Sequence, residues 1–93
     1  MLKLVISPAA AETIRYLPPS IKRGVKQAIR AIAADPGCGE PLERELAEYR
    51  KFKVRRFRIV YAIDRGRRIV RIVAVGPRRT IYEDLAERLR GGS

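Results

Sequence analysis

The chain has 93 residues, of which 21 are Lys or Arg and 10 are Asp or Glu, so its formal net charge is +11 at pH 7. This length suits one domain with a single modest core, and the charge favours polyanionic partners such as nucleic acid or an acidic protein. One cysteine, Cys38, and no histidine exclude an internal disulfide, a zinc-ligand set and a histidine base. We therefore expect no metal and no cofactor, and any catalysis must use Lys, Arg, Tyr or a carboxylate.

The first third of the chain predicts one strand and two helices. Residues 2–6 are a short apolar run typical of a buried strand. The opening segment, residues 1–11, has too short an apolar part for a signal peptide and is interrupted by Pro8. Ser7 and Pro8 suit the N-cap and the first position of a helix that continues to about Tyr16. A longer helix is expected from Ser20, with apolar side chains at helical spacing at Ile21, Val25, Ala28, Ile29 and Ile32.

The other face of this second helix is basic. It carries four cationic side chains, Lys22, Arg23, Lys26 and Arg30. Such a face is either simply solvated or a docking surface for an acidic partner, and the sequence leaves both interpretations open. Turn residues 35–39 end the helix. No apolar run approaches the roughly 20 residues that a membrane span needs, so we expect no association with a membrane.

Three strands and a last helix are expected in the rest of the chain. Residues 40–48 are ambiguous between an irregular segment and a short helical turn. Residues 49–64 suit two strands joined by a turn at Arg55-Arg56, and a second turn at 64–66 leads to a β-branched strand over residues 69–75. Gly76 and Pro77 end that strand, and residues 80–89 suit a short helix.

This order of elements predicts an α+β fold. It comprises an N-terminal strand, a helix hairpin, an antiparallel three-strand meander and a short C-terminal helix, with the helix hairpin on one face of the meander. We expect a single domain over residues 1–90 and a frayed tail over residues 91–93.

The first two strands of the meander separate apolar from cationic side chains. Because side chains alternate along a strand, one face receives Phe52, Val54, Phe57, Ile59, Tyr61 and Ile63. Lys51, Lys53 and Arg58 fall on the other face, with Lys53 directly opposite Arg58. Like charges in that arrangement are unfavourable by up to about 1 kcal/mol, which suggests that an anion lies between them. The alternative is a solvated outer face.

The end of the last strand supplies further candidates. Gly76-Pro77 releases Arg78 and Arg79 at the edge of the sheet, where loop residues commonly form sites. If the last strand lies beside the strand that carries Arg58, then Arg78 can approach the basic face. Tyr82 follows Arg78 by four residues. Arginines in the turns, including Arg55 and Arg56, suit electrostatic contact with RNA phosphate.

Three segments of this sequence resemble one known family. They are LPPSIKRGVKQAIRAIAADP, YRKFKVRRFRIVYAID and VAVGPRRTIYEDL, and together they are similar to the RelE/ParE superfamily of bacterial and archaeal toxins. The resemblance covers nearly the whole chain and implies the microbial RNase-like α+β layer of that family. It also implies an antitoxin with an acidic or amphipathic segment that wraps and neutralises the toxin, as a hetero-oligomer in the cytoplasm.

The RelE branch implies an activity, that of a ribosome-dependent endoribonuclease that cuts messenger RNA and inhibits translation. Matched motif by motif, the family's hairpin lysines correspond to Lys51 and Lys53 and its hairpin arginine to Arg58. Its later arginine corresponds to Arg78 and its tyrosine to Tyr82, with a shorter gap between the two than in the best-known members. The catalytic set that the resemblance implies is Lys53, Arg58, Arg78 and Tyr82, and the RNA contacts that we expect are Lys51, Arg55, Arg56 and Arg79.

Such a set fits cleavage of RNA by its own 2′-hydroxyl group. Clustered fixed cations stabilise a pentavalent phosphorus, and the guanidinium of Arg58 or Arg78 suits a phosphate, with Arg78 near the leaving oxygen. Nearby cations should favour the phenolate of Tyr82 below its usual pKa of about 10, so that it could act as the base. Lys53 is an alternative proton carrier. Tyr82 could also simply pack the last helix onto the sheet.

Two other functions stay open at the level of sequence. The ParE branch of the same superfamily poisons DNA gyrase and is not a nuclease, so the basic face would then need no cleavage site. The second alternative is a non-catalytic nucleic-acid-binding protein, although few exposed aromatic residues are available for base stacking.

Overall fold

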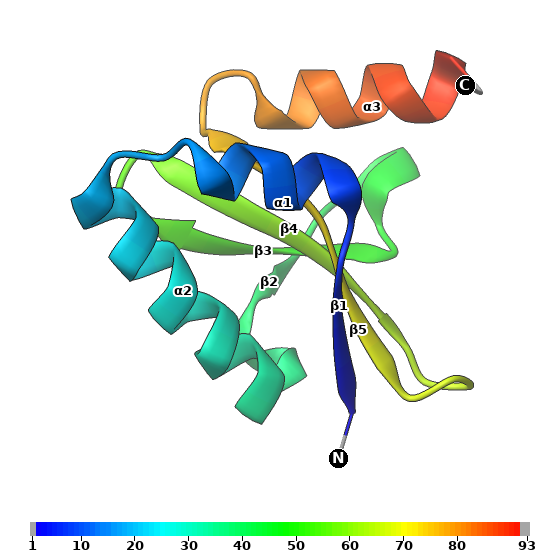
Figure 1. Cartoon of the computed structure of the whole chain (residues 1–93). Helices are drawn as coiled ribbons and strands as arrows, with labels where there is room; N and C mark the ends of the chain where they lie inside the picture. The colour runs from blue at the N-terminus through cyan, green and yellow to red at the C-terminus, as the bar shows by residue number, and fades with distance from the viewer. Residues whose placement is uncertain (1, 92–93) are drawn as a thin grey trace.

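The computed structural model describes residues 2–91, which form one five-stranded sheet with helices on both faces (Figure 1). The strands are β1 (Lys3–Ile6), β2 (Glu40–Pro41), β3 (Tyr49–Val54), β4 (Phe57–Asp64) and β5 (Ile69–Pro77). The helices are α1 (Pro8–Arg15), α2 (Pro19–Ala34) and α3 (Ile81–Gly91), with 3-10 turns at Pro36–Cys38 and Arg44–Leu46. The strand order is β1-β5-β4-β3-β2, and only β1 runs parallel to its neighbour.

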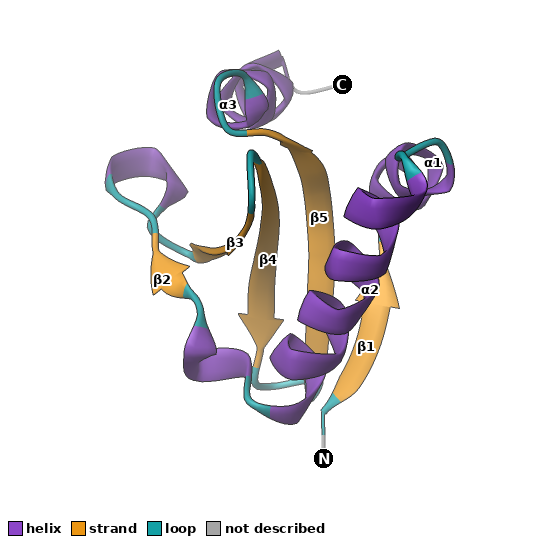
Figure 2. Cartoon of the chain, turned by 90° about the vertical axis from the view of Figure 1, so that its left-hand side faces the viewer, coloured by secondary structure: helices purple, strands orange, loops and turns teal. Residues whose placement is uncertain are grey.

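Helices α1 and α2 cover one face of the sheet, as the apolar spacing predicts (Figure 2). The predicted cap of α1 is confirmed, because Oγ of Ser7 accepts a hydrogen bond from the Ala10 N–H at 3.1 Å. The apolar stripe of α2 packs on the inward face of β3, β4 and β5, where Val25, Ile32, Ile59 and Ile72 are fully buried. Within residues 2–91, no helix is both long and apolar enough to cross a membrane.

The other face of the sheet is also covered, by α3 and the segment before β3. Val60 and Ala74 of the sheet pack there against Ile81 and Leu85 of α3 and against Leu46. The prediction of a single modest core is therefore wrong, because apolar clusters lie on both sides of the sheet. It failed because the apolar residues of α3 are few, and their burial depends on a tertiary contact with small side chains of β4 and β5.

The predicted meander is confirmed, and so is its register. Lys53 pairs with Arg58, Phe52 pairs with Ile59, and β5 lies beside β4. Tyr61 belongs to the core, where its hydroxyl donates to the Pro36 carbonyl oxygen at 2.6 Å and accepts from the Gly39 N–H at 2.9 Å. These bonds fix the chain that leads into β2.

The structure also differs from the sequence predictions in detail. The ambiguous segment contains the two-residue strand β2 and a 3-10 turn, which are too short to show a periodic pattern. Helix α2 begins at Pro19, one residue earlier than expected, and α3 ends at Gly91, which was expected in the tail. The remaining tail residues, 92 and 93, lie outside the described residues, as does Met1.

Candidate active site

Four of the predicted site residues line one open cleft at an end of the sheet. The cleft has a volume of about 570 Å³ and is lined by Arg55, Arg56, Pro77, Arg78 and Arg79. Its two sides come from the β3–β4 turn and the β5–α3 loop, which are joined by a hydrogen bond from the Arg78 N–H to the Arg56 carbonyl oxygen at 2.7 Å. All four arginines are exposed, so this arginine cleft can receive an anion from solvent.

Arg58 does not line the arginine cleft, but its side chain is hydrogen-bonded to the β3–β4 turn that forms one side of the cleft. The residue is only 7% exposed, and its Nη1 donates to the carbonyl oxygens of Arg55 at 2.9 Å and Phe57 at 2.8 Å. Arg55 has a φ of 54°, a left-handed conformation that is uncommon for residues other than glycine. Arg58 thus stabilises a strained turn in this state, and its contact with phosphate stays a prediction.

Tyr82 belongs to the first turn of α3 and faces the cationic side of the sheet. Its hydroxyl is buried and has no hydrogen-bond partner among residues 2–91. Burial raises the pKa of Tyr82 above its ordinary value of 10.0, and this outweighs the opposite effect of the nearby Arg58 and Arg78 guanidinium groups on the same pKa. The neighbouring cations do favour the phenolate, as expected, but loss of hydration on burial is the larger effect, so the pKa of Tyr82 is raised overall.

The two hairpin lysines have different surroundings. Nζ of Lys51 lies 5.9 Å from the centre of the Tyr82 ring, a cation–π arrangement. Nζ of Lys53 lies 3.7 Å from Oε1 of Glu40, and the Lys53 side chain is 58% exposed. The repulsion expected between Lys53 and Arg58 is relieved by Glu40 and by the turn carbonyls, so the pair itself requires no external anion.

The predicted site residues thus form two groups, and one residue lies apart from both. Arg55, Arg56, Arg78 and Arg79 meet in the arginine cleft, whereas Tyr82 of α3 lies close to Lys51 and Arg58 of the sheet. Lys53 instead pairs with Glu40 of β2. Fixed cations open to solvent can bind a phosphate and stabilise added negative charge. No group of three metal-binding side chains occurs among residues 2–91.

Sequence reasoning missed two residues that shape this region. Glu40 pairs with Lys53 and raises the pKa of Tyr82, and Pro77 lines the arginine cleft. Glu40 lies in the segment that showed no clear pattern. Pro77 was read only as the end of a strand, although a residue next to Arg78 in an exposed loop was a candidate for lining the same site.

Comparison with known proteins identifies the family. Residues 4–82 match the family model described as ParE toxin of type II toxin–antitoxin system, parDE. The chain belongs to this toxin family. The predicted membership of the RelE/ParE superfamily is thereby confirmed. No curated protein sequence matches the toxin.

Solved structures share the fold of the toxin. The toxin–antitoxin complex RelBE2 from Mycobacterium tuberculosis matches with 28% identity and a TM-score of 0.74, covering 83% of this chain and 98% of that chain. The isolated Escherichia coli RelE toxin has 20% identity and a TM-score of 0.73, covering 96% and 99%. The YoeB–YefM complex from Staphylococcus aureus has 20% identity and a TM-score of 0.65, covering 81% and 94%. The α+β fold of the superfamily is confirmed, and several similar structures are toxin–antitoxin complexes.

Proposed function

We propose that this toxin is a ribosome-dependent endoribonuclease that cuts messenger RNA and so inhibits translation in the cytoplasm. The observation that supports this most directly is the arginine cleft, which holds four exposed guanidinium groups around one opening. Its partners would then be the ribosome, messenger RNA and a cognate antitoxin that forms a hetero-oligomer with it. The toxin domain spans residues 1–90 in this proposal.

The arginine cleft would bind the scissile phosphate. Guanidinium groups of Arg55, Arg56 and Arg79 hold phosphate oxygens, and Arg78 neutralises charge on the leaving oxygen as the bond to phosphorus breaks. Clustered guanidinium charges attract the added negative charge of a pentavalent phosphorus more strongly than the single charge of the bound phosphate, so they stabilise the transition state more than the bound RNA. Lys51 adds positive potential on the cationic face of the sheet.

Two groups remain as proton carriers for the attacking 2′-hydroxyl and the leaving oxygen. Lys53 is accessible, since its side chain is more than half exposed. Tyr82 can act only when its hydroxyl becomes accessible, because it is buried in this state and its pKa is raised. The ribosome would orient the RNA and supply any missing acid–base group, so free RNA should be cut poorly.

The proposal is tested by primer extension on a defined message in a translating extract. We expect cuts within codons that disappear when ribosomes are removed. Replacing Arg78 by Gln should reduce cleavage by about 100-fold, as loss of one transition-state donor does. The matched control is Arg88→Gln, which removes an equal charge from the exposed last turn of α3 and should leave cleavage unchanged. An intact message, or equal activity in both variants, would contradict the proposal.

A second candidate function is poisoning of DNA gyrase. It is favoured by the family model, whose description names a ParE toxin, and by the burial of the Tyr82 hydroxyl. A gyrase supercoiling assay with the purified toxin separates the two activities. Inhibition of supercoiling together with an intact message would assign the toxin to the gyrase-directed class, and the arginine cleft would then be a binding surface.

A further inference from the structure

The arginine cleft holds more positive charge than one or two RNA phosphates neutralise. Each phosphodiester of an RNA strand carries one negative charge, so even two successive phosphates bring only two negative charges to four guanidinium groups. No carboxylate lines the cleft, and no ion pair among residues 2–91 involves its arginines. Half of the positive charge in the cleft would therefore stay without a partner when RNA is bound there.

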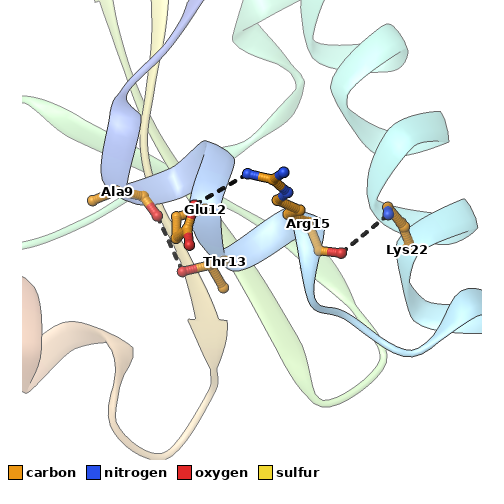
Figure 3. A network of polar contacts seen from close by, with 5 residues as sticks. All are labelled: Ala9, Glu12, Thr13, Arg15 and Lys22. Carbon is orange, nitrogen blue, oxygen red and sulfur yellow. Dashed lines mark hydrogen bonds and ion pairs between the residues drawn. The ribbon is translucent and has the colours of Figure 1, made fainter.

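Several cationic side chains elsewhere in the fold do have partners. Nη1 of Arg15 lies 3.9 Å from Oε2 of Glu12, and Nζ of Lys22 donates to the Arg15 carbonyl oxygen at 3.1 Å (Figure 3). Arg58 likewise donates to carbonyl oxygens of the β3–β4 turn. The four arginines of the cleft are instead exposed around one opening, so their charges repel one another until an anion binds.

The β3–β4 turn keeps an arginine at a position that favours glycine. Arg55 is the first of the two turn residues and has a φ of 54°. Hairpin turns with a positive φ at this position usually have glycine there, because a side chain strains the backbone. Such strained residues gather at functional sites, where the side chain has a task. The guanidinium of Arg55 therefore matters more to the cleft than the conformational preference of the turn.

The lining of the cleft also determines which part of a ligand it can recognise. The guanidinium groups only donate hydrogen bonds, and the remaining side chain, that of Pro77, is apolar. This lining has no side-chain acceptor for the amino groups of a nucleobase. Because it has no carboxylate, it also offers no ligand to a metal ion. The cleft thus suits an anion that carries neither a recognised base nor a bound metal.

We propose that the arginine cleft binds a metal-free chain of three or more linked phosphates. An internal phosphate of such a chain carries one negative charge and a terminal phosphate about 1.5–2 at neutral pH, so a triphosphate matches four guanidinium groups. The cleft volume of about 570 Å³ lies within the usual range for small-ligand sites. Each guanidinium can donate two parallel hydrogen bonds to one phosphate, which suits phosphates that are directly linked.

A phosphate chain in the arginine cleft would exclude RNA from the same guanidinium groups. The toxin would then be inhibited by a small anion, most effectively when free Mg²⁺ is low. This inhibition rests on the proposed function, whereas binding of the phosphate chain does not. Nucleoside triphosphates and inorganic polyphosphate share the required chemistry, and the test includes both.

Calorimetric titration of the purified toxin in metal-free buffer tests the binding. Tripolyphosphate should bind about 100-fold more tightly than inorganic phosphate, because it contacts several guanidinium groups at once. ATP should bind within about fivefold of tripolyphosphate, since the lining has no acceptor for the base. A tetraglutamate peptide spreads its charges along a longer chain and should bind about tenfold more weakly than tripolyphosphate, or worse. Equimolar Mg²⁺ should weaken the binding of both phosphate chains, because it neutralises them.

Substitutions connect this binding with the cleft. Arg79→Gln should weaken tripolyphosphate binding about tenfold, since it removes one of four guanidinium groups. The control Arg88→Gln removes an equal charge outside the cleft lining and should change affinity by less than about twofold. Arg55→Gly should weaken binding about as much as Arg79→Gln, while the thermal midpoint of the free toxin rises by about 3 °C because glycine relieves the strained φ. A loss of affinity together with a gain in stability cannot arise from misfolding.

Competition tests whether the phosphate chain and RNA share the cleft. Tripolyphosphate should displace a fluorescent short RNA from the purified toxin without any ribosome, whereas tetraglutamate at the same concentration should displace little. RNA that stays bound at saturating tripolyphosphate would overturn the shared site. Primer extension measures the nuclease activity separately, so failure of that proposal is distinguishable from failure of this one.

The proposal is overturned if tripolyphosphate binds no more tightly than inorganic phosphate or tetraglutamate. It is also overturned if Arg79→Gln and Arg88→Gln lose affinity equally, which would show only the general attraction of a cationic protein for anions. Tight binding of ATP that requires Mg²⁺ would overturn it as well, because the lining would then recognise a metal-bound ligand.

Discussion

Arg58 holds the conformation of the β3–β4 turn through its Nη1 group. Nη1 donates hydrogen bonds to the carbonyl oxygens of Arg55 and Phe57. The Arg56 carbonyl oxygen of the same turn accepts a hydrogen bond from the Arg78 N–H. Because Arg55 adopts a left-handed φ, the turn requires such support. The geometry of the arginine cleft therefore depends on a buried side chain that does not line it.

Replacing Arg58 by Met should loosen the arginine cleft in the free toxin. We expect the backbone amide of Arg78 to exchange with solvent about tenfold faster, because the turn that accepts its hydrogen bond loses two bonds of about 1 kcal/mol each. Amide exchange measured by NMR tests this. Lys53→Met removes a charge from the opposite strand position and should leave the Arg78 amide protected. Equal protection in Arg58→Met would show that Arg58 does not hold the turn.

Tyr82 should ionise above pH 10. Its folded pKa is raised by burial, and the same direction holds for Tyr49 and Tyr61. Below pH 10, each of these tyrosines is neutral in folded and unfolded chains, so their titration does not change stability. Above it, the unfolded chain ionises first, and the free energy of unfolding falls as pH rises through the raised pKa.

Ultraviolet absorbance of the phenolate during an alkaline titration checks this prediction. The absorbance change that is lost in Tyr82→Phe should have its midpoint above pH 10, the ordinary pKa of tyrosine. Removal of a buried hydroxyl without a hydrogen-bond partner should also leave stability unchanged or higher. A Tyr82 titration near neutral pH would instead support the phenolate base that the sequence suggested.

Helix α3 is the element that decides whether the cationic face is covered. Its buried residues Ile81 and Leu85 contact Val60 and Ala74, and Leu85 is only 4% exposed. Helix α2 and its basic outward face lie on the other side of the sheet. Tyr82 itself belongs to α3, so this helix both carries the tyrosine and buries its hydroxyl against the sheet.

Replacing Leu85 by Ala should detach or loosen α3. The loss of a buried leucine side chain should reduce the free energy of unfolding by about 2–4 kcal/mol. The pKa of Tyr82 should fall towards 10, because its hydroxyl would regain water. Denaturant unfolding and the alkaline titration test both effects, with Leu89→Ala on the exposed side of α3 as the control. An unchanged Tyr82 titration in Leu85→Ala would show that α3 does not control access to the hydroxyl.

The whole molecule is strongly self-repelling, since its formal charge is +11 on 93 residues. The described ion pairs are long, at 3.7–3.9 Å, and lie between largely exposed side chains, so they contribute little stability. A polyanionic partner would stabilise the toxin by neutralising this charge.

Salt should therefore stabilise the free toxin. Between about 20 mM and about 200 mM salt, the shorter screening length reduces repulsion, and the thermal midpoint should rise by several degrees. RNA affinity should fall over the same range, because the entropy gained when counterions are released from the RNA is smaller at higher salt concentration. Scanning calorimetry and binding titrations at matched salt concentrations measure the two trends. A midpoint that falls with added salt would contradict net repulsion.

The sequence by itself determined the local elements and their pairing. Helical spacing in residues 21–32, the Ser7-Pro8 cap and strict alternation on both sides of Arg55-Arg56 fixed α1, α2 and the β3–β4 hairpin. These patterns depend on contacts between residues that are close in sequence, or on the burial of one face of an element. They can therefore be recognised from the order of the residues alone. Two of the family motifs lie on α2 and this hairpin, and the third lies on β5 and α3. Arg78 of the proposed cleft was named from the third motif, and Arg55 and Arg56 from their place in a turn.

Only the tertiary structure decided which site residues are accessible. The burial of Tyr82 against the sheet and the pairing of Lys53 with Glu40 bring separate segments of the chain together, whereas Arg58 donates to carbonyl oxygens only one and three residues away. Whether a cation or a phenol faces solvent depends on what packs over it, and α3 covers the sheet through a few long-range contacts. A side chain covered in this way loses its hydration, and this loss cannot be predicted from the pattern of residues along the chain.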